Sequence, residues 1–280
     1  MGINRKGALY IVATPIGNLE DITLRAIRVL KGVQMIAAED TRRTRTLLRL
    51  YQINTPMTSL HDHIESKKSN TLISKMNEGM DVAIVSDAGT PGISDPGYVL
   101  VSKAIAEGIK IIPVPGASAV VTALCVSGLP MDSFAFYGFL PSRDGKRRQF
   151  LSALRDETET MVFYESPKRL TKSLRDIGEI FGDRNVVIAR EMTKVFEEIM
   201  RGTVREVLNG IQGRVVKGEV TIVIGGKENA PLSFSDDEIL AKFKELMKGS
   251  VASRRDIIEK VAKQLGIPKK KVYRLVVDRT

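Results

Sequence analysis

Short apolar runs alternate with amphipathic segments through the first two thirds of the chain. The runs have four to six residues, are rich in β-branched side chains, and are typical of buried strands. They are residues 9–13, 35–38, 82–86 and 109–114. Between them apolar residues recur three and four positions apart, as in Ile22, Ala26 and Leu30, which indicates helices that cover a sheet. The alternation predicts an α/β domain over residues 1–115.

A second α/β domain is predicted over residues 116–230, after a joint at Pro115-Gly116. Its expected strands are residues 134–137, 160–164, 186–189, 198–201 and 220–224. A helix is expected over residues 167–180. Because the strand patterns after residue 185 lie close together in the sequence, part of this sheet is predicted to be antiparallel or mixed.

Turn and linker residues at 225–231 mark the start of a third domain, predicted over residues 231–280. Ser235 and Glu238 have the spacing of a capping box, in which each side chain caps the other's backbone N–H. Three short helices are expected at residues 237–248, 254–265 and 269–278. The last two, with the break at 266–268 between them, resemble a helix–turn–helix.

Positive charge is concentrated in this tail. The whole chain has 43 Lys and Arg against 33 Asp and Glu, a formal charge of +10. Residues 241–280 hold twelve basic and four acidic residues, so about eight of the excess charges lie there. A charge of this kind favours a polyanionic partner, although a solvated, Lys-rich helical bundle would have the same pattern. The first 240 residues are close to neutral.

The single cysteine excludes an internal disulfide and a cysteine-cluster metal site. Cys125 lies in the apolar, small-residue stretch 119–128, and we expect a core position rather than a nucleophile. No apolar run approaches the ~20 residues that cross a bilayer. No signal peptide is apparent at the N-terminus. We therefore expect a cytoplasmic protein without a membrane partner.

A metal site is also not expected. His61 and His63, with Asp62 and Glu65 nearby, have a spacing that could suggest ligands, but a third ligand is not evident in this polar stretch. A solvated loop is the better interpretation.

Three loops follow predicted strands and carry the residues best suited to a ligand. Neither a Walker loop nor a strict G-x-G-x-x-G motif is present. Residues 13–21 follow the first strand, where open α/β sheets bind ligands. Residues 86–97 place three Gly, two Pro and two Asp in twelve positions, which lets backbone approach a ligand closely in a fixed shape. Residues 113–119 open the next helix with small side chains.

These loops and several later segments carry a family resemblance. In chain order the segments are ATPIGNLEDITLRA, AAEDTRRT, SDAGTPGISDPG, PGASA, FYGFLP, FYESPKR, AREMTK and GEVTIVIGG. The set, which extends over residues 8–226, resembles the ribosomal RNA branch of the tetrapyrrole methylase superfamily. The tail resembles the small C-terminal helical domain found in this branch.

The resemblance implies an α/β fold of two domains with a cofactor cleft between them, plus the small helical domain. It implies S-adenosylmethionine as the methyl donor, a homodimer, and 2′-O-methylation of a cytidine ribose in 16S ribosomal RNA of the small subunit. Tetrapyrrole methylases carry a G-x-G-P-G-D-P loop where this chain has residues 14–18, and S-G-D-P where it has 86–91. These departures place a porphyrin-like substrate in doubt.

Cofactor binding is transferred by the resemblance to residues of both domains. They are Pro15, Ser86, Asp87, Ala88, Gly89, Thr90, Ile93, Ser118, Ala119, Phe136, Tyr164, Glu165, Pro167, Glu219 and Thr221.

Catalytic candidates must be polar residues at strand ends near the cleft, because the enzyme has to align a weakly nucleophilic hydroxyl with the methyl carbon. We assign Asp40, Arg42, Glu191 and Lys194 to this group, without choosing a single base. Asp40 could instead cap the next helix, and Glu191 with Lys194 could be a surface ion pair. The candidates for RNA phosphate contacts are Arg43, Arg147, Arg148, Arg254, Arg255, Lys269, Lys270, Lys271 and Arg274.

Two other functions fit the sequence less well than RNA methylation. A methylase of a small tetrapyrrole-like substrate would have no evident use for the basic tail. A nucleic-acid-binding regulator with a degenerate enzyme domain would not need the intact loops at 86–97 and 115–119. The sequence therefore favours the RNA methyltransferase.

Overall fold

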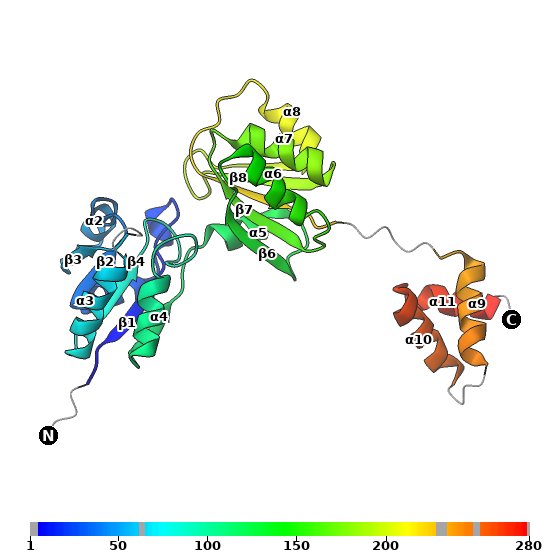
Figure 1. The fold of residues 1–280 in the computed structure, drawn as a ribbon, viewed down its shortest axis with the longest axis horizontal. Coiled ribbons are helices and arrows are strands. Elements are labelled where there is room, and N and C mark those ends of the chain that lie inside the picture. The colour runs from blue at the N-terminus through cyan, green and yellow to red at the C-terminus, as the bar shows by residue number, and fades with distance from the viewer. Residues whose placement is uncertain (1–4, 62–64, 228–233, 249–252, 279–280) are drawn as a thin grey trace. The chain divides into compact units, whose positions relative to one another are not determined.

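The chain forms two compact units in a computed structural model that describes residues 5–61, 65–227, 234–248 and 253–278 (Figure 1). The first unit extends to Lys227 and contains two five-stranded sheets. The second unit begins at Glu228 and is helical where it is described. The predicted architecture of two α/β halves and a small helical domain is confirmed.

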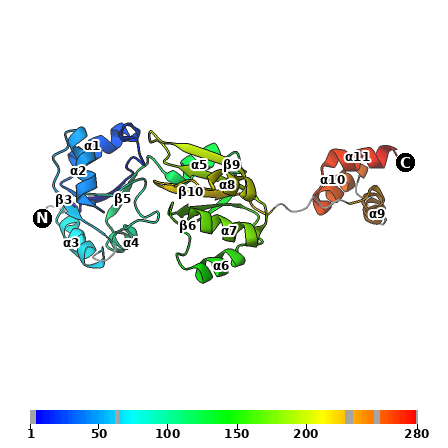
Figure 2. The same cartoon turned by 90° about the horizontal axis from the view of Figure 1, so that it is seen from above.

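The first sheet is parallel throughout and has the strand order β3-β2-β4-β1-β5. Its strands are β1 (Ala8–Val12), β2 (Met35–Ala38), β3 (Met57–Ser59), β4 (Val82–Val85) and β5 (Lys110–Val114). Its helices are α1 (Leu24–Gly32), α2 (Thr41–Leu50), α3 (Glu65–Asn77) and α4 (Tyr98–Ala106). Helices α1 and α2 pack on one face and α3 and α4 on the other (Figure 2). Both faces are covered, which explains why β4 is apolar and buried at every position.

The second sheet is mixed, as predicted, with the order β6-β7-β10-β8-β9. Its strands are β6 (Phe134–Phe139), β7 (Thr160–Glu165), β8 (Asn185–Arg190), β9 (Glu198–Thr203) and β10 (Val220–Ile224). Only the β6–β7 pair is parallel. One face packs against α6 (Asp144–Ala153), α7 (Leu170–Phe181) and α8 (Val204–Ile211). The other face packs against α5 (Ala119–Ser127).

Two hydrogen bonds join the first and second predicted ligand loops. The Thr14 N–H donates to the Gly89 carbonyl at 2.8 Å, and the Gly89 N–H donates to the Thr14 carbonyl at 3.0 Å. Gly89 has φ +83°, a conformation in which a side chain would be strained. The pair is an isolated antiparallel bridge between the loops that follow the parallel strands β1 and β4, and it fixes residues 13–16 beside residues 86–90.

A buried carboxylate fixes the far end of the second loop. Glu65, on α3, is 6% exposed and accepts hydrogen bonds from the N–H groups of Gly97, Val99 and Leu100. These are donors of the first turn of α4, which lack partners within the helix. The cap therefore comes from a different helix, and the negative charge suits the helix N-terminus.

Arg147 corrects one sequence prediction. Its side chain is 2% exposed and forms ion pairs with Asp176 at 2.6 Å and Asp144 at 2.9 Å. The guanidinium therefore joins α6 to α7 inside the second half, and it is not available to RNA. Its neighbour Arg148 is 45% exposed and contacts Asp176 and Glu179.

Cys125 is also placed differently from the prediction. It is exposed on α5, where Val121 and Val126 are exposed as well. The helix buries Val120, Ala123 and Leu124 against the second sheet. The apolar stretch is thus covered on one side only.

The second unit contains α9 (Asp236–Met247), α10 (Arg254–Leu265) and α11 (Lys269–Asp278). The predicted capping box of Ser235 and Glu238 is present, and Ser253 with Asp256 forms another at α10. Ile239, Phe243, Val261 and Val272 contribute to a core shared by the three helices. Within the described residues, no helix of the chain is long and apolar enough to span a membrane.

Replacing Arg147 by Ala is expected to lower the free energy of unfolding by about 3 kcal/mol. This is the lower end of the range for breaking a buried ion pair, because Arg148 still neutralises Asp176. Lys146→Ala, an exposed change one residue earlier in α6, should cost at most about 0.5 kcal/mol. Urea unfolding measures both, and equal stability of the two variants would contradict the assignment.

Candidate functional site

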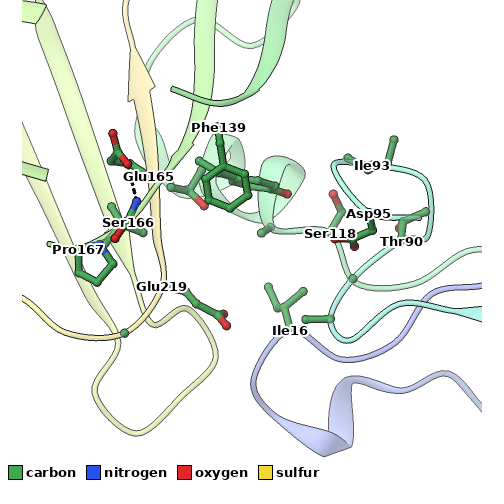
Figure 3. A pocket seen from close by; sticks show the side chains of 17 residues that line it. Ile16, Thr90, Ile93, Asp95, Ser118, Phe139, Glu165, Ser166, Pro167 and Glu219 are labelled. Carbon is green, nitrogen blue, oxygen red and sulfur yellow. Dashed lines mark hydrogen bonds between the residues drawn. The ribbon is translucent and has the colours of Figure 1, made fainter. Parts of the chain in front are cut away.

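A pocket of about 300 Å³ lies in the first unit, with walls from both sheets (Figure 3). Ile16, Thr90, Ile93, Asp95 and Ser118 face Phe139, Glu165, Ser166, Pro167 and Glu219 across it. The remaining lining residues are Ala88, Gly89, Ala119, Tyr164, Gly218, Val220 and Thr221. The pocket therefore lies at the carboxyl ends of β1 and β4, where parallel sheets bind ligands.

The first wall is built from backbone and small side chains. The Thr14–Gly89 pair holds Ile16 next to Ala88 and Gly89. Ser86 is buried, and its hydroxyl is within hydrogen-bonding distance of the Gly89 carbonyl at 3.3 Å. The Thr90 hydroxyl donates to the Ala117 carbonyl at 3.3 Å. These contacts fix the shape of the loop and leave its backbone accessible to a ligand at close range.

The opposite wall is aromatic and acidic. The Tyr164 ring contacts Phe136 and Phe139 edge to face, with centroid distances of 4.9 and 5.4 Å. The Glu165 carboxylate lies beside them but has protein partners: it accepts from the Ser166 N–H, the Ser173 hydroxyl and Arg169. Glu165 therefore shapes the start of α7.

Two carboxylates from opposite walls act on the Tyr164 phenol. Burial raises the pKa of Tyr164 to about 12, and the negative charges of Asp95 and Glu219 add to the rise. Asp95 belongs to the first half and Glu219 precedes β10 in the second. The pocket is thus negative as well as apolar, and its phenol stays protonated at neutral pH.

Lys194 lies at the edge of the pocket between two glutamates. Its ammonium contacts Glu191 at 2.9 Å and Glu219 at 3.0 Å. Burial lowers the pKa of Lys194, but the two hydrogen bonds raise it more, so that it lies above its usual value. Burial raises the pKa of Glu191, but Lys194 and the Glu219 N–H bring it below its usual value. Lys194 is therefore a fixed cation at neutral pH.

The loop that carries Lys194 is held against the first half of the unit. The Asn18 N–H donates to the Thr193 hydroxyl at 3.0 Å. A Cβ on Gly17 would lie 2.8 Å from the Met192 carbonyl oxygen, so only glycine permits this approach. Glu191 and Thr193 have φ of 50° and 66°, which is rare for residues with side chains and is common near functional sites.

Most of the predicted cofactor residues line this pocket. They are Ala88, Gly89, Thr90, Ile93, Ser118, Ala119, Tyr164, Glu165, Pro167, Glu219 and Thr221. Four do not: Pro15 is buried before Ile16, Ser86 and Asp87 lie before Ala88, and Phe136 packs behind Tyr164. Their contacts support the walls from outside the pocket.

The two pairs of catalytic candidates lie in different surroundings. Asp40 caps α2 through the Arg42 N–H and pairs with the Arg42 side chain at 2.7 Å. Hydrogen bonds from Arg42 hold the pKa of the Asp40 carboxyl far below its usual range. Asp87 accepts from the Asp40 N–H and pairs with Arg43 at 3.2 Å. Asp40 and Arg42 are not among the lining residues, whereas Glu191 and Lys194 touch the lining residue Glu219.

The basic residues of the second unit that were predicted to contact RNA phosphates are exposed. Arg254, Arg255, Lys269, Lys270, Lys271 and Arg274 all lie at the surface of α10 and α11. Lys269 pairs with Glu259. Lys270, Lys271 and Arg274 line a recess beside the first turn of α9. In the first unit, Arg43 is exposed next to Asp87.

Sequence reasoning missed six lining residues: Ile16, Asp95, Phe139, Ser166, Gly218 and Val220. Ile16 and Asp95 lie in the loops at residues 13–21 and 86–97, which were predicted to bind a ligand. Their location in these loops was the available signal. Phe139 enters the pocket because β6 has a register irregularity between Phe136 and Phe139. The signal for it was Gly138, a glycine inside an aromatic strand pattern, which has φ +67° and is typical of a bulge.

The described residues contain no cluster of three or more His, Cys, Asp or Glu that could hold a metal ion. Asp62 and His63 lie outside the described residues. Glu65, the other acidic residue of that segment, caps α4.

The sequence and the fold match a known class of proteins. The family model for tetrapyrrole (corrin/porphyrin) methylases matches residues 8–208. The solved uroporphyrin-III-C-methyltransferase of Thermus thermophilus superimposes with a TM-score of 0.56 at 20% identity, over 86% of this chain and 99% of that one. At this identity the likeness shows the fold.

Two relatives define the group within the class. The ribosomal RNA small subunit methyltransferase I of Halalkalibacterium halodurans is 44% identical over 96% of this chain and 94% of its own length. The protein of the same name from Thermotoga maritima is 51% identical over 222 residues, which are 79% of this chain and 100% of that protein. The chain therefore belongs to the tetrapyrrole methylase family and, within it, to the ribosomal RNA small subunit methyltransferase I group.

We expect one of the six tyrosines to ionise near pH 12 in the folded protein, and Tyr164→Phe to remove that transition. Asp95→Asn should shift it to lower pH, because a negative charge that disfavours the phenolate is lost while burial remains. Ultraviolet difference spectroscopy follows the phenolate. An unchanged titration in both variants would show that Tyr164 is not the buried phenol.

Proposed function

We propose that the protein transfers a methyl group from S-adenosylmethionine to the ribose 2′-oxygen of a cytidine in 16S ribosomal RNA of the small subunit. The observation that carries this proposal is the pocket between the two halves, in a chain 44% identical to a ribosomal RNA small subunit methyltransferase I over nearly its full length. The relatives' name gives the reaction and the RNA. The donor, the 2′-oxygen and the cytidine are our inference.

The pocket residues fit this donor chemically. S-adenosylmethionine has a positive sulfonium and a positive ammonium group, and the Asp95 and Glu219 carboxylates supply negative charge around Tyr164. The Tyr164 and Phe139 rings offer apolar surface and negative ring faces, which favour cations. The small residues at 88–90 and 118–119 would receive the rest of the molecule. When bound, the donor supplies an electrophilic methyl carbon.

The protein's part in the reaction is to align the two reactants and to stabilise charge. The 2′-hydroxyl oxygen would form a bond to the donor's methyl carbon as the carbon–sulfur bond breaks, and the hydroxyl proton would pass to solvent water. Alignment in a fixed site can supply several kcal/mol of the barrier. Lys194, held by Glu191 and Glu219, can contact a phosphate or the developing negative charge on the ribose oxygen. Its raised pKa keeps it charged, so it does not take the proton at neutral pH.

RNA affinity is assigned to the second unit. The second unit presents Arg255, Lys270, Lys271 and Arg274 at its surface, and such residues bind phosphates with little base preference. The Thermotoga relative aligns over its full length with 222 residues of this chain, a length close to that of the first unit alone. We infer that the first unit holds the reaction, and that the second unit adds affinity.

A tetrapyrrole-like substrate is the less supported alternative. The fold relative with that kind of name is 20% identical, against 44% and 51% for the ribosomal RNA methyltransferases. The basic second unit would serve no purpose on a small substrate.

A homodimer in the cytoplasm is also part of the proposal. Both follow from the family resemblance and from the ribosomal substrate. Exposed apolar side chains at Val121, Val126, Met131 and Phe134 provide surface that association would bury. Sedimentation velocity measures the oligomeric state.

The reaction is tested with radiolabelled S-adenosylmethionine and small subunits from a strain that lacks the activity. We expect label at one cytidine ribose of 16S RNA, and no label in a tetrapyrrole offered in parallel. Label in the tetrapyrrole alone would overturn the proposal in favour of the alternative.

Ala119→Phe links the reaction to the pocket. We expect donor affinity to fall roughly 100-fold or more, because the ring would occupy the volume that encloses the ligand. Val121→Phe adds the same ring to the exposed side of the same helix and should bind the donor normally. Isothermal titration calorimetry compares the two, and equal affinities would place the donor elsewhere.

Deleting residues 232–280 should weaken RNA binding and reduce its dependence on salt while leaving donor binding intact. Each lost phosphate contact lowers the slope of log affinity against log salt by roughly 0.7–0.9. The charge-reversed triple variant of Lys270, Lys271 and Arg274 to Glu should act in the same direction with the unit present. Equal RNA affinity of the wild-type and truncated proteins at several salt concentrations would refute a role for the unit.

A further inference from the structure

A second recess lies in the same unit as the pocket and has both an aromatic wall and positive charge. It has a volume of about 240 Å³. Its lining residues are Arg190, Phe196, Glu198, Met200, Arg214, Val215, Val216 and Lys217. Three of them are cationic and one is acidic, so the recess has a net positive formal charge.

The aromatic side chain of this recess is exposed although its loop is well fixed. Phe196 is 71% exposed, and its neighbour Val195 is 94% exposed. The flanks of the tip are held by three hydrogen bonds: Lys194 N–H to the Glu191 carbonyl, Glu197 N–H to the Lys194 carbonyl, and Thr193 N–H to the Glu197 carboxylate at 2.7 Å. The loop therefore presents an aromatic ring to solvent in a fixed position, an arrangement that favours a ligand over the core.

The cations are fixed beside that ring. Glu198 accepts from Arg190 at 3.0 Å and from Arg214 at 2.8 Å. Arg190 also donates to the Lys217 carbonyl at 3.2 Å. One carboxylate thus orients two guanidinium groups, and Arg214 remains 49% exposed. Guanidinium groups held in this way suit phosphate oxygens or the edge of a base.

The recess and the pocket are lined by neighbouring residues of the chain and have no lining residue in common. Lys217 lines the recess, and Gly218 and Glu219 line the pocket. Met200 and Val216 of the recess pack on the sheet face that carries α6–α8, whereas Ala119 and Tyr164 of the pocket pack on the α5 face. Arg190 and Glu191 repeat this arrangement, because Arg190 lines the recess and Glu191 bonds to the Glu219 N–H.

We infer that this recess binds a nucleotide of the same RNA that is methylated, with its base stacked on Phe196 and its phosphate near Arg214 and Lys217. The inference rests on the proposed function, because it takes single-stranded RNA as the substrate. RNA segments are recognised by stacking of unpaired bases on aromatic side chains together with backbone contacts to cations. The net positive charge favours this occupant over a second copy of the chain.

Phe196→Ala is expected to weaken binding to small ribosomal subunits roughly 5- to 100-fold, the loss that corresponds to one unstacked base, with donor affinity unchanged. Val195→Ala removes an apolar side chain from the same tip but outside the recess, and should bind RNA within about twofold of wild type. Filter binding and calorimetry give the two affinities. RNA affinity of Phe196→Ala within twofold of wild type would overturn the inference.

Phe196→Trp keeps a stacking ring and adds the only tryptophan, since the chain has none. Its fluorescence should be quenched by a cytidine-containing single-stranded RNA oligonucleotide, at near wild-type affinity. Ile105→Trp, exposed at the end of α4 near the start of β5, should show no quenching. Absence of quenching at saturating RNA would overturn the inference even if Phe196→Ala proves to be misfolded.

The oligomeric state tests the other candidate for the recess, a second copy of the chain. A dimer that dissociates in Phe196→Ala, seen by sedimentation velocity, would assign the ring to a protein interface and overturn the inference. Failure of the proposed function is a different result: the wild-type protein would then transfer no methyl group to small-subunit RNA. The tryptophan titration needs no methyl transfer and reports on the recess independently.

Discussion

The pair of hydrogen bonds between Thr14 and Gly89 organises the candidate site. Strands β1 and β4 are neighbours in a parallel sheet, and the loops that follow them would otherwise diverge. The pair is an isolated antiparallel bridge beyond the ends of the two strands, and it places Ile16 beside Ala88 and Gly89. The contact of Gly17 and Asn18 with Thr193 then joins this wall to the second half. Both walls of the pocket therefore depend on the conformation of residues 13–18.

Charge is divided by sign between the pocket and its surroundings. The pocket is acidic, with Asp95 and Glu219 near the Tyr164 phenol. Lys194 marks its edge, and the recess around Phe196 is net positive. A small cationic ligand and a polyanionic one are thus favoured at different places of the same unit. This arrangement brings together two reactants that need opposite electrostatic environments.

The sequence was most informative where burial on both faces gives a simple apolar pattern. The predicted strands at 35–38 and 220–224 agree with β2 and β10, and the tail helices at 254–265 and 269–278 agree with α10 and α11. Among the strands and α-helices, three were not predicted: β3, α6 and α8. The short strand β3 is only partly buried, and α6 buries the charged Arg147, which interrupts an apolar period. The eight residues of α8 did carry a signal, because Thr203 and Glu206 form a capping box.

The site was predicted in part, for similar reasons. Loop residues such as Thr90 and Ser118 follow predicted strands, so topology alone brings them to one edge. Whether a charged residue faces a ligand or another side chain depends on tertiary packing. Arg147 was expected at an RNA surface and is buried, while Asp40 caps a helix. Phe196 lies two residues after the AREMTK segment and was not singled out, and its exposure is visible only in the fold.

The cap that Glu65 supplies to α4 has a consequence for the order in which the site forms. A helix that is capped by its own preceding residue can form locally, but the first turn of α4 is completed by α3, more than thirty residues earlier in the sequence. The end of the loop at 86–97 therefore becomes ordered only when α3 has docked. Opening of α3 would release that loop as well, so the two should exchange amide hydrogens as one cooperative unit.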